Sequence, residues 1–275
     1  MAKNYEAPVS VRELEKMLNS FTYHNGFEIS RVFDDWLIYI MFNFTPNPQP
    51  NPDWHYKPEH NQVFHDMMLE WFKAMDKEVS ENSWFDAFGI LYEACIVSNS
   101  RASNSGQFFT PACVCDMMAM LNVNKDNKPI GKKVNDPTCG SGRTLLAFQM
   151  VAPGNYLVGE DLDRTCVLMT ICNFLIHGVV GEVVWHDSLQ PDTYFAGWKV
   201  NTNLNNPYHK YNGLPHVEPM TKEQSFVWKH WEAVRLDVEA KKQLPKEIKR
   251  VEPTKELEEV LVIQSTKFIN QLSLF

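Results

Sequence analysis

Apolar side chains in the first 100 residues recur at the three- and four-residue intervals that are typical of amphipathic helices. Phe, Trp and Met fill many of these positions, and packing in a core is the ordinary use of such side chains. A run of alternating prolines at 45–52 interrupts the pattern, because proline fixes φ and lacks a backbone donor. We predict a helical N-terminal domain over residues 1–100, with helices at 11–20, 33–44, 61–77 and 83–97.

Beyond a polar linker at 98–105, short apolar strands alternate with helices. This alternation predicts a parallel α/β sheet in a domain at 101–215. The fourth strand is unusual, since its apolar residues alternate with asparagines, whereas a central strand of such a sheet is apolar on both faces. The fourth strand therefore has one solvent-exposed face or lies at an edge of the sheet. The predicted strands are 133–136, 156–159, 182–185 and 198–204.

Residues 216–275 are predicted as a helical tail, with one amphipathic helix at 226–242 and a second helical run from Lys255. No pattern in this tail predicts three further strands. The predicted sheet therefore ends after its fourth strand.

Composition narrows the class of protein. The chain has 275 residues, 44% hydrophobic and 22% charged, which is typical of a globular protein. It shows no apolar stretch that could span a bilayer and no secretory start, so we expect a cytoplasmic location. The six cysteines lack paired CxxC spacing, so we expect reduced thiols and no metal site. The net charge of −8 argues against tight binding to nucleic acid by this chain alone, so a partner would have to supply such affinity.

Polar residues follow the first three predicted strands, and ligands of doubly wound sheets bind at this carboxyl edge. The first strand ends in the turn Asp136-Pro-Thr-Cys-Gly-Ser-Gly, whose glycines let a ligand approach the backbone; a plain tight turn is the alternative. Asp161 lies about twenty residues after the glycines, where a carboxylate can accept both hydroxyls of a ribose, or can simply cap a helix. Asp187 follows the third strand, where it can reach an adenine edge. Together the three sites predict a ligand crevice.

The predicted fourth strand is followed by Asn205, Asn206, Pro207 and Tyr208. An exocyclic amine is a poor nucleophile because its lone pair is delocalised into the ring. Acceptors on both amino hydrogens can free that lone pair, and an aromatic ring can hold a base that has been flipped from the duplex. An ordinary Asn-Pro loop is the alternative.

In this order, the motifs resemble those of gamma-class N6-adenine DNA methyltransferases, above all the modification subunit of type I restriction systems. The most specific part of the resemblance is the pairing of the turn at Asp136 with the segment Gly106-Gln107-Phe108-Phe109-Thr110-Pro111. The resemblance covers roughly residues 85–210. It implies a Rossmann-like S-adenosylmethionine-dependent methyltransferase sheet, methyl transfer to the exocyclic amino group of adenine in DNA, and a separate specificity subunit as partner.

The resemblance also implies which residues bind S-adenosylmethionine. Residues 106–111 would close over its methionine end, with Thr110 near the carboxylate. Asp161 would take the ribose hydroxyls and Asp187, with Leu189, the adenine. The methionine side would be lined by Asp136, Thr138, Cys139 and Gly140.

At the target base, Asn205 and the carbonyl of Asn206 would hold the amino group while Tyr208 stacks on the ring. The sequence departs from the family at three points. Position 206 is Asn where the family usually has proline, and Asp161 stands where it usually has Glu. The third departure is the absence of a pattern for the family's last three strands, so either a partner completes the sheet or the chain is a reduced, inactive relative.

The last constellation is Gln271, Leu272, Ser273, Leu274 and Phe275. It resembles the pentapeptide with which bacterial proteins dock on the DNA polymerase sliding clamp. The alternative is an apolar helix end that packs back on the domain.

Two other functions compete with DNA methylation. One is a cofactor-binding accessory or pseudo-methyltransferase in a DNA-modification complex, which the missing strands and acidic balance favour. The other is methylation of a protein glutamine, a reaction that uses a similar Asn-Pro turn. The segment 106–111 argues against the second, because it points to the DNA enzymes.

Overall fold

The computed structural model describes residues 8–97, 109–124, 126–190 and 192–243. Contacts within the chain divide it into two units, Met1–Trp231 and Glu232–Phe275. The sheet, the helices before it and the sites described below belong to the first unit. The domain boundaries at 100 and 215 stay predictions.

A five-stranded mixed sheet forms the centre of the first unit, with strand order β1-β2-β3-β4-β5. Strands β1, β2 and β3 are parallel, whereas β4 is antiparallel to β3 and β5 is antiparallel to β4. The α/β class is confirmed, but the expectation of an all-parallel sheet is wrong. The strands are β1 (Lys133–Asp136), β2 (Tyr156–Asp161), β3 (Gly181–Trp185), β4 (Ala196–Val200) and β5 (Val217–Met220).

The direction of β4 follows from the short connection that precedes it. A parallel crossover needs about a dozen or more residues, usually with a helix, whereas residues 186–195 lie between β3 and β4. The predicted strand at 198–204 begins too late and ends too late, because the residues after Val200 form a turn. Strand β5 was missed. It contains Pro219, which argues against a strand in sequence but is tolerated at a sheet edge.

The N-terminal region is helical, as predicted. It contains η1 (Val9–Val11), α1 (Arg12–Asn25), α2 (Ile29–Phe44), α3 (Pro58–Asn82), α4 (Ala87–Leu91) and the π-helical turn η2 (Tyr92–Val97). Aromatic side chains fill its core, as their spacing predicted. The largest fully buried ones include Phe33, Trp36, Phe64, Trp71 and Phe88.

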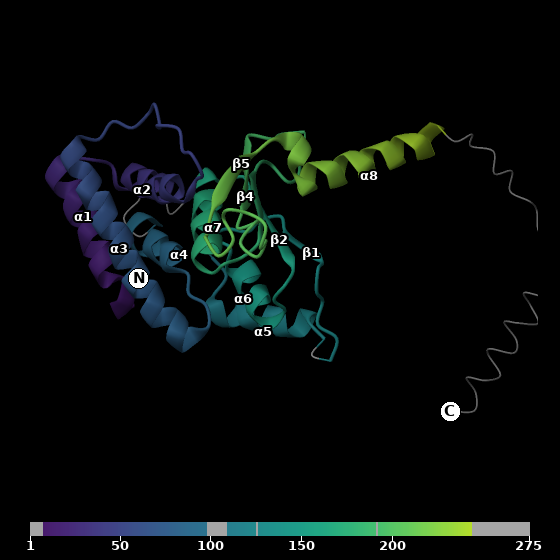
Figure 1. Ribbon diagram of the computed structural model, residues 1–275, viewed down its shortest axis with the longest axis horizontal. Helices are drawn as coiled ribbons and strands as arrows, with labels where there is room; N and C mark the ends of the chain where they lie inside the picture. The colour runs from purple at the N-terminus through teal and green to yellow at the C-terminus, as the bar shows by residue number, and fades with distance from the viewer. Residues whose placement is uncertain (1–7, 98–108, 125, 191, 244–275) are drawn as a thin grey trace, which may run out of the picture. The chain divides into compact units, whose positions relative to one another are not determined.

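Helix α7 (Arg164–Ile176) joins this helical region to the sheet. It packs against α2 on one side and against β2 and β3 on the other (Figure 1). Consequently every residue from Cys166 to Leu175 is buried. Two further helices, α5 (Ala112–Asn122) and α6 (Arg143–Val151), pack against each other near β1 (Figure 1).

The face of the sheet opposite α7 has a polar group at its centre. Glu182 of β3 is 2% exposed and accepts hydrogen bonds from the Ser225 hydroxyl (2.9 Å), the Phe226 amide (2.8 Å) and the Tyr156 hydroxyl (3.0 Å). Phe226 begins α8 (Phe226–Gln243), which follows the turn η4 (Lys222–Gln224). A carboxylate at the first turn of a helix is favourable, because the amides there lack partners within the helix.

All six cysteines lie in the described residues and none forms a disulfide; five of them are buried, and Cys113 is exposed. In the described part of the chain, no helix is long and apolar enough to cross a membrane. The same residues contain no group of three or more His, Cys, Asp or Glu side chains suited to hold a metal ion.

Candidate cofactor site

The turn after β1 is built around two glycines with positive φ. Gly140 has φ 56° and Gly142, which caps α6, has φ 87°, and both values favour glycine over any other residue. A Cβ on Gly140 would lie 2.9 Å from the Phe109 ring. The turn therefore needs glycine both for its backbone and for the close approach of Phe109.

Asp136 holds the turn from its own end of β1. One carboxylate oxygen accepts the Thr138 amide at 3.1 Å, and the other accepts the Thr144 hydroxyl from the first turn of α6. Thr138 itself is exposed. The predicted methionine-side residues therefore share one small, hydrogen-bonded loop.

Asp161 lies at the end of β2 and faces this loop. Its carboxylate accepts the Gly140 amide at 2.9 Å and the Asp163 amide at 2.8 Å. Burial raises the pKa of Asp161 above the ordinary 3.8, although these two backbone hydrogen bonds act in the opposite direction. A carboxylate has about four acceptor positions, so lone pairs remain for further donors such as ribose hydroxyls.

Cys139 has a structural rather than a chemical place in the turn. Its amide donates to the Glu160 carbonyl at 2.9 Å, which ties the turn to β2. Its thiol lies 3.5 Å from the Thr170 hydroxyl, and burial raises the pKa of that thiol well above 9.0. A buried neutral thiol of this kind packs rather than reacts.

The third strand end is joined to the first by the side chain of Ser188, which lies between Asp187 and Leu189 in the sequence. The Ser188 hydroxyl donates to the Pro137 carbonyl at 2.6 Å. Asp187 accepts the Leu189 amide at 2.9 Å, and its own amide donates to the Thr193 hydroxyl at 3.0 Å. The Leu189 side chain is 92% exposed. The Ser188 bond thus holds the loop that contains Asp187 and Leu189 beside Pro137 of the glycine turn, but neither Asp187 nor Leu189 lines the cavity described next, and their predicted contact with adenine stays a prediction.

A cavity of about 410 Å³ opens between these elements. Of the predicted cofactor residues, those that line it are Phe109, Thr110, Asp136, Thr138, Cys139, Gly140 and Asp161. Pro111, also predicted, is exposed and caps α5. Gly106, Gln107 and Phe108 lie outside the described residues.

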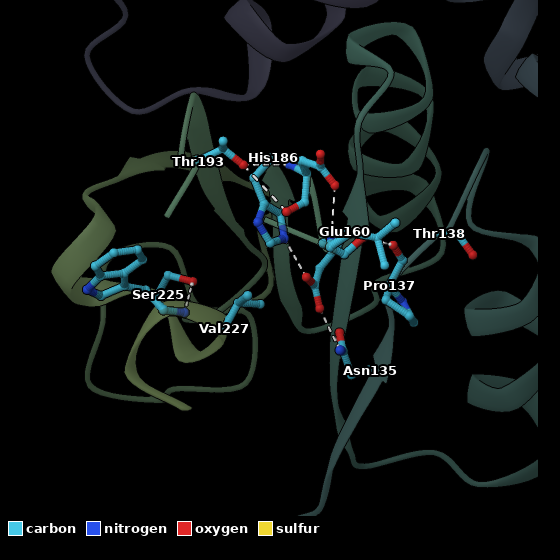
Figure 2. Close-up of polar contacts among 12 residues, drawn as sticks. Asn135, Pro137, Thr138, Glu160, His186, Thr193, Ser225 and Val227 are labelled. Atoms are coloured by element: carbon cyan, nitrogen blue, oxygen red, sulfur yellow. Dashed lines mark hydrogen bonds and ion pairs between the residues drawn. The ribbon is translucent and has the colours of Figure 1, made fainter. Parts of the chain in front are cut away.

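Beneath the carboxyl edge, a polar network connects the ends of the three parallel strands. Glu160 accepts a hydrogen bond from Asn135 at 2.5 Å and pairs with His186 (Figure 2). Glu160 and His186 are only 4% and 2% exposed. The alternation of side chains along β1 and β2 places Asn135 and Glu160 on one face, a signal that was present in the sequence but was not used.

The sequence analysis also gave no role to four buried polar side chains that bond to one another behind the glycine turn: Asp86, Ser141, Arg143 and Asn173. Asp86, the N-cap of α4, accepts hydrogen bonds from Ser141, Arg143 and Asn173 at 2.6, 2.6 and 2.8 Å. The only local signal was the position of Asp86 directly before an apolar helix. The partner residues are distant in sequence, so their contact is a property of the fold.

The turn at 205–208 lies at the other edge of the sheet. In the antiparallel register, Trp185 is beside Ala196 and Gly181 is beside Val200. Asp161 is beside Trp185, so the cofactor edge is at the Ala196 end. The chain therefore leaves β4 at the opposite, amino edge, and four residue steps of β3 correspond to about 13 Å. The parallel sheet predicted from the sequence would have put this turn at the carboxyl edge, and the antiparallel direction of β4 is the reason that it lies elsewhere.

Within the turn, the predicted target-binding groups are exposed and partly bonded to one another. The Asn206 carbonyl accepts the His209 amide at 3.0 Å, and the Asn206 side chain accepts the Tyr208 amide at 3.1 Å. Asn205, Asn206 and Pro207 are exposed, and Tyr208 is 97% exposed. The structure brings these four residues together with each other but not with the cofactor cavity.

Two curated proteins that are similar to this chain are both methylase subunits of type I restriction enzymes. The methylase subunit of the type I restriction enzyme EcoEI from Escherichia coli is 28% identical in an alignment of 115 positions, which covers 37% of this chain and 23% of that subunit. The MjaVII methylase subunit from Methanocaldococcus jannaschii is 26% identical in an alignment of 139 positions, which covers 47% of this chain and 23% of that subunit. The chain thus matches about a quarter of the length of these curated relatives.

A solved type I restriction-modification methyltransferase subunit from Streptococcus thermophilus is 20% identical, and the match covers 68% of this chain and 42% of that one with a TM-score of 0.34. The family model described as N-6 DNA Methylase matches residues 83–237. That range includes the glycine turn, Asp161, Asp187 and the whole sheet, and it is more than half of the sequence. The chain belongs to the N-6 DNA methylase family.

Proposed function

We propose that this chain binds S-adenosylmethionine at the carboxyl edge of β1, β2 and β3 and contributes that site to a cytoplasmic DNA-modification complex. The observation that carries the proposal is the contact between Gly140 and Asp161 at the cavity wall, 2.9 Å from amide to carboxylate. It joins the two groups that such a cofactor needs: a backbone open to close approach and a carboxylate for the ribose.

The residues present fit the cofactor. The cavity wall has no Cβ at Gly140, and the half-buried Asp161 carboxylate keeps lone pairs for both ribose hydroxyls. Thr110 and Thr138 would hold the methionine end, and Asp187 with Leu189 would bind the adenine. When bound, the cofactor supplies a methyl group that its sulfonium already activates, so the chain's own residues need only bind and orient it.

The geometry favours an accessory, cofactor-binding role over unaided methyl transfer. A target amine must be held by its acceptors next to the methyl group, and the Val200–Gly181 register puts Asn205 and Tyr208 beyond the other edge of the sheet. On this proposal another chain of the complex supplies the groups that hold the target adenine.

Direct transfer to adenine is the second candidate. It is favoured by family membership and by the presence of Asn205, Pro207 and Tyr208 in the chain. The same turn would also serve methylation of a protein glutamine, but the match to the N-6 DNA methylase family favours DNA.

The open edge of β1 suits a partner that completes the sheet. Among the described residues, β1 pairs with β2 alone. A groove of about 370 Å³ is lined by residues of β1, α5 and α6, with Val134, Met118 and Phe148 in its wall. The partner, a specificity subunit or another chain of the complex, would also supply DNA affinity that a net charge of −8 does not favour.

Two measurements test the proposal. Calorimetry with S-adenosylmethionine and S-adenosylhomocysteine should show one site, and the absence of binding at millimolar ligand would contradict it. Transfer of a tritiated methyl group to DNA should be undetectable with the chain alone. Transfer by the chain alone, lost in Asn205→Ala with cofactor affinity unchanged, would instead establish the direct mechanism.

A further inference from the structure

Arg143 occupies an unusual place, because it follows the glycine turn directly yet turns its side chain away from solvent. The side chain is 10% exposed. Its Nε donates to Asp86 at 2.6 Å and its Nη2 donates to Glu93 at 3.1 Å. Burial by itself would lower the pKa of Arg143, but Asp86 and Glu93 outweigh it and raise the pKa. The guanidinium is therefore a permanent charge held between two carboxylates of the helical region.

The same guanidinium contacts the segment at the mouth of the cavity. Its Nη1 donates to the Thr110 carbonyl at 3.4 Å, and its carbon lies 5.3 Å from the centre of the Phe109 ring. Phe109 in turn packs against Gly140. One side chain thus bonds the backbone of Thr110 and packs on the ring that covers the glycine turn.

Arg143 and Phe109 also separate two spaces. Both line the 410 Å³ cavity, and both line an apolar cavity of about 320 Å³ on the side of Trp84 and Ile90. Without the Arg143 fork, Phe109 has open volume behind it, and the carbonyl of Thr110 loses its cationic donor. The ribose side of the site has different support, since Asp161 is held by Gly140 and Asp163.

We propose that Arg143 is a positioning residue that holds Phe109 and Thr110 at the methionine end of the site and so sets affinity for that half of the ligand. The inference rests on the proposed binding of S-adenosylmethionine. The role requires the planar guanidinium and not only its charge, because its Nε, Nη1 and Nη2 atoms bond Asp86, Thr110 and Glu93 respectively.

The test compares two ligands that share adenosine and differ in the amino-acid end. Affinities for S-adenosylhomocysteine and for 5′-methylthioadenosine are measured by calorimetry in the wild type, Arg143→Gln and Arg143→Lys. Arg143→Gln should weaken S-adenosylhomocysteine about tenfold and change 5′-methylthioadenosine less than about twofold. Arg143→Lys keeps the charge but not the fork, and should fall between.

The ratio of the two affinities is the readout that a general structural role would not move. Equal weakening of both ligands, or no change in either, overturns the inference. Wild-type protein that binds neither ligand contradicts the proposed function instead. Arg31→Gln is the control, because Arg31 pairs with Asp35 on α2 at 3.9 Å and does not line the cavity.

Thermal unfolding shows whether each variant is folded. If Arg143→Gln does not fold, Glu93→Ala provides the second test, because it removes one partner of Arg143 and leaves the Asp86 pair. It should shift the ratio in the same direction by roughly two- to fivefold. A ratio equal to that of the wild type overturns the inference.

Discussion

Asn201 and His216 close the β4–β5 connection by bonding to each other twice. The Asn201 amide donates to the His216 carbonyl at 2.8 Å, and the His216 amide donates to the Asn201 side chain at 3.0 Å. The Asn201 side chain also donates to the carbonyls of Phe174 and Val179 at 2.9 and 3.0 Å. Asn201 is fully buried at φ 56°. It therefore anchors the loop that contains 205–208 to the amino edge of the sheet.

Asn201→Ala should destabilise the protein by about 2–4 kcal/mol, because it removes the buried hydrogen bonds to the Phe174 and Val179 carbonyls and the acceptor of the His216 amide. Urea unfolding measures the change. Asn206→Ala, on the exposed part of the same loop, is the control and should stay within about 0.5 kcal/mol. If the two variants were equally stable, the anchor would have no energetic importance.

The distance between the cofactor cavity and the turn at 205–208 can be measured directly. Spin labels at Leu189→Cys and Tyr208→Cys, with Cys113→Ser to remove the exposed thiol, should give a dipolar distance longer than the roughly 13 Å rise along β3. Both side chains are almost fully exposed, so the labels should not disturb the fold.

A second pair, Leu189→Cys with Thr138→Cys, is the short-distance control, because Ser188 and Pro137 bond at this edge. If Tyr208 were as close to Leu189 as Thr138 is, the turn would lie at the cofactor edge after all, and direct transfer would regain support.

The contrast between these sites shows which features are local enough to predict. The turn from Asp136 to Gly142, the helix after it and the carboxylate at Asp161 depend on glycine and on strand ends, which short segments reveal. The direction of β4 depends on the length of the preceding connection and on the burial of Asn201 among carbonyls far away in sequence. Pro219 hid β5, since only its edge position makes proline acceptable there.

Contacts around the site between residues far apart in sequence could not be predicted, because they depend on the fold. Asp86 and Arg143 are far apart in sequence, and neither belongs to a motif that names the other. The stretches 106–108 and 271–275 were singled out by resemblance, and they lie outside the described residues. Their predicted roles stay predictions.

Acid should weaken cofactor binding through Asp161. Burial raises the pKa of this carboxyl above 3.8, so it becomes protonated at a higher pH than an exposed aspartate. A neutral carboxyl is a weaker acceptor for ribose hydroxyls, and affinity for S-adenosylhomocysteine should fall as pH drops through the raised pKa. Asp161→Ala should cost about 1–3 kcal/mol of binding at neutral pH.

Stability should respond in the opposite direction. A native carboxyl with a raised pKa binds its proton more readily than the unfolded chain does, so its contribution to the free energy of unfolding falls as pH rises from 3.8 through the raised pKa. Asp161→Asn removes this dependence and the acid-linked loss of affinity together. An unchanged pH profile in Asp161→Asn would assign the titration to another group.

We predict that the segment from Gln271 to Phe275 docks on a sliding clamp, which would bring this acidic protein to DNA. A sliding clamp encircles the duplex, so a protein tethered to it meets DNA at a high local concentration and needs only weak contacts of its own. Short peptides anchored by two or three apolar side chains bind modestly, because ordering them costs much of the contact free energy. We therefore expect micromolar affinity for a bacterial clamp, with Leu274 and Phe275 as anchors. Fluorescence anisotropy with a labelled clamp measures it.

Deletion of 271–275 should abolish clamp binding and leave the calorimetric affinity for S-adenosylhomocysteine unchanged, since the described cavity lies within residues 109–166. Leu274→Ala combined with Phe275→Ala should have the same effect, because together these two side chains provide most of the apolar surface of the pentapeptide. Ser273→Ala is the matched control, and it should bind like the wild type. Clamp binding that survives both the deletion and the double substitution would place the contact elsewhere in the chain. Loss of cofactor binding on deletion would show that the segment packs on the domain, which is the alternative that its apolar side chains also allow.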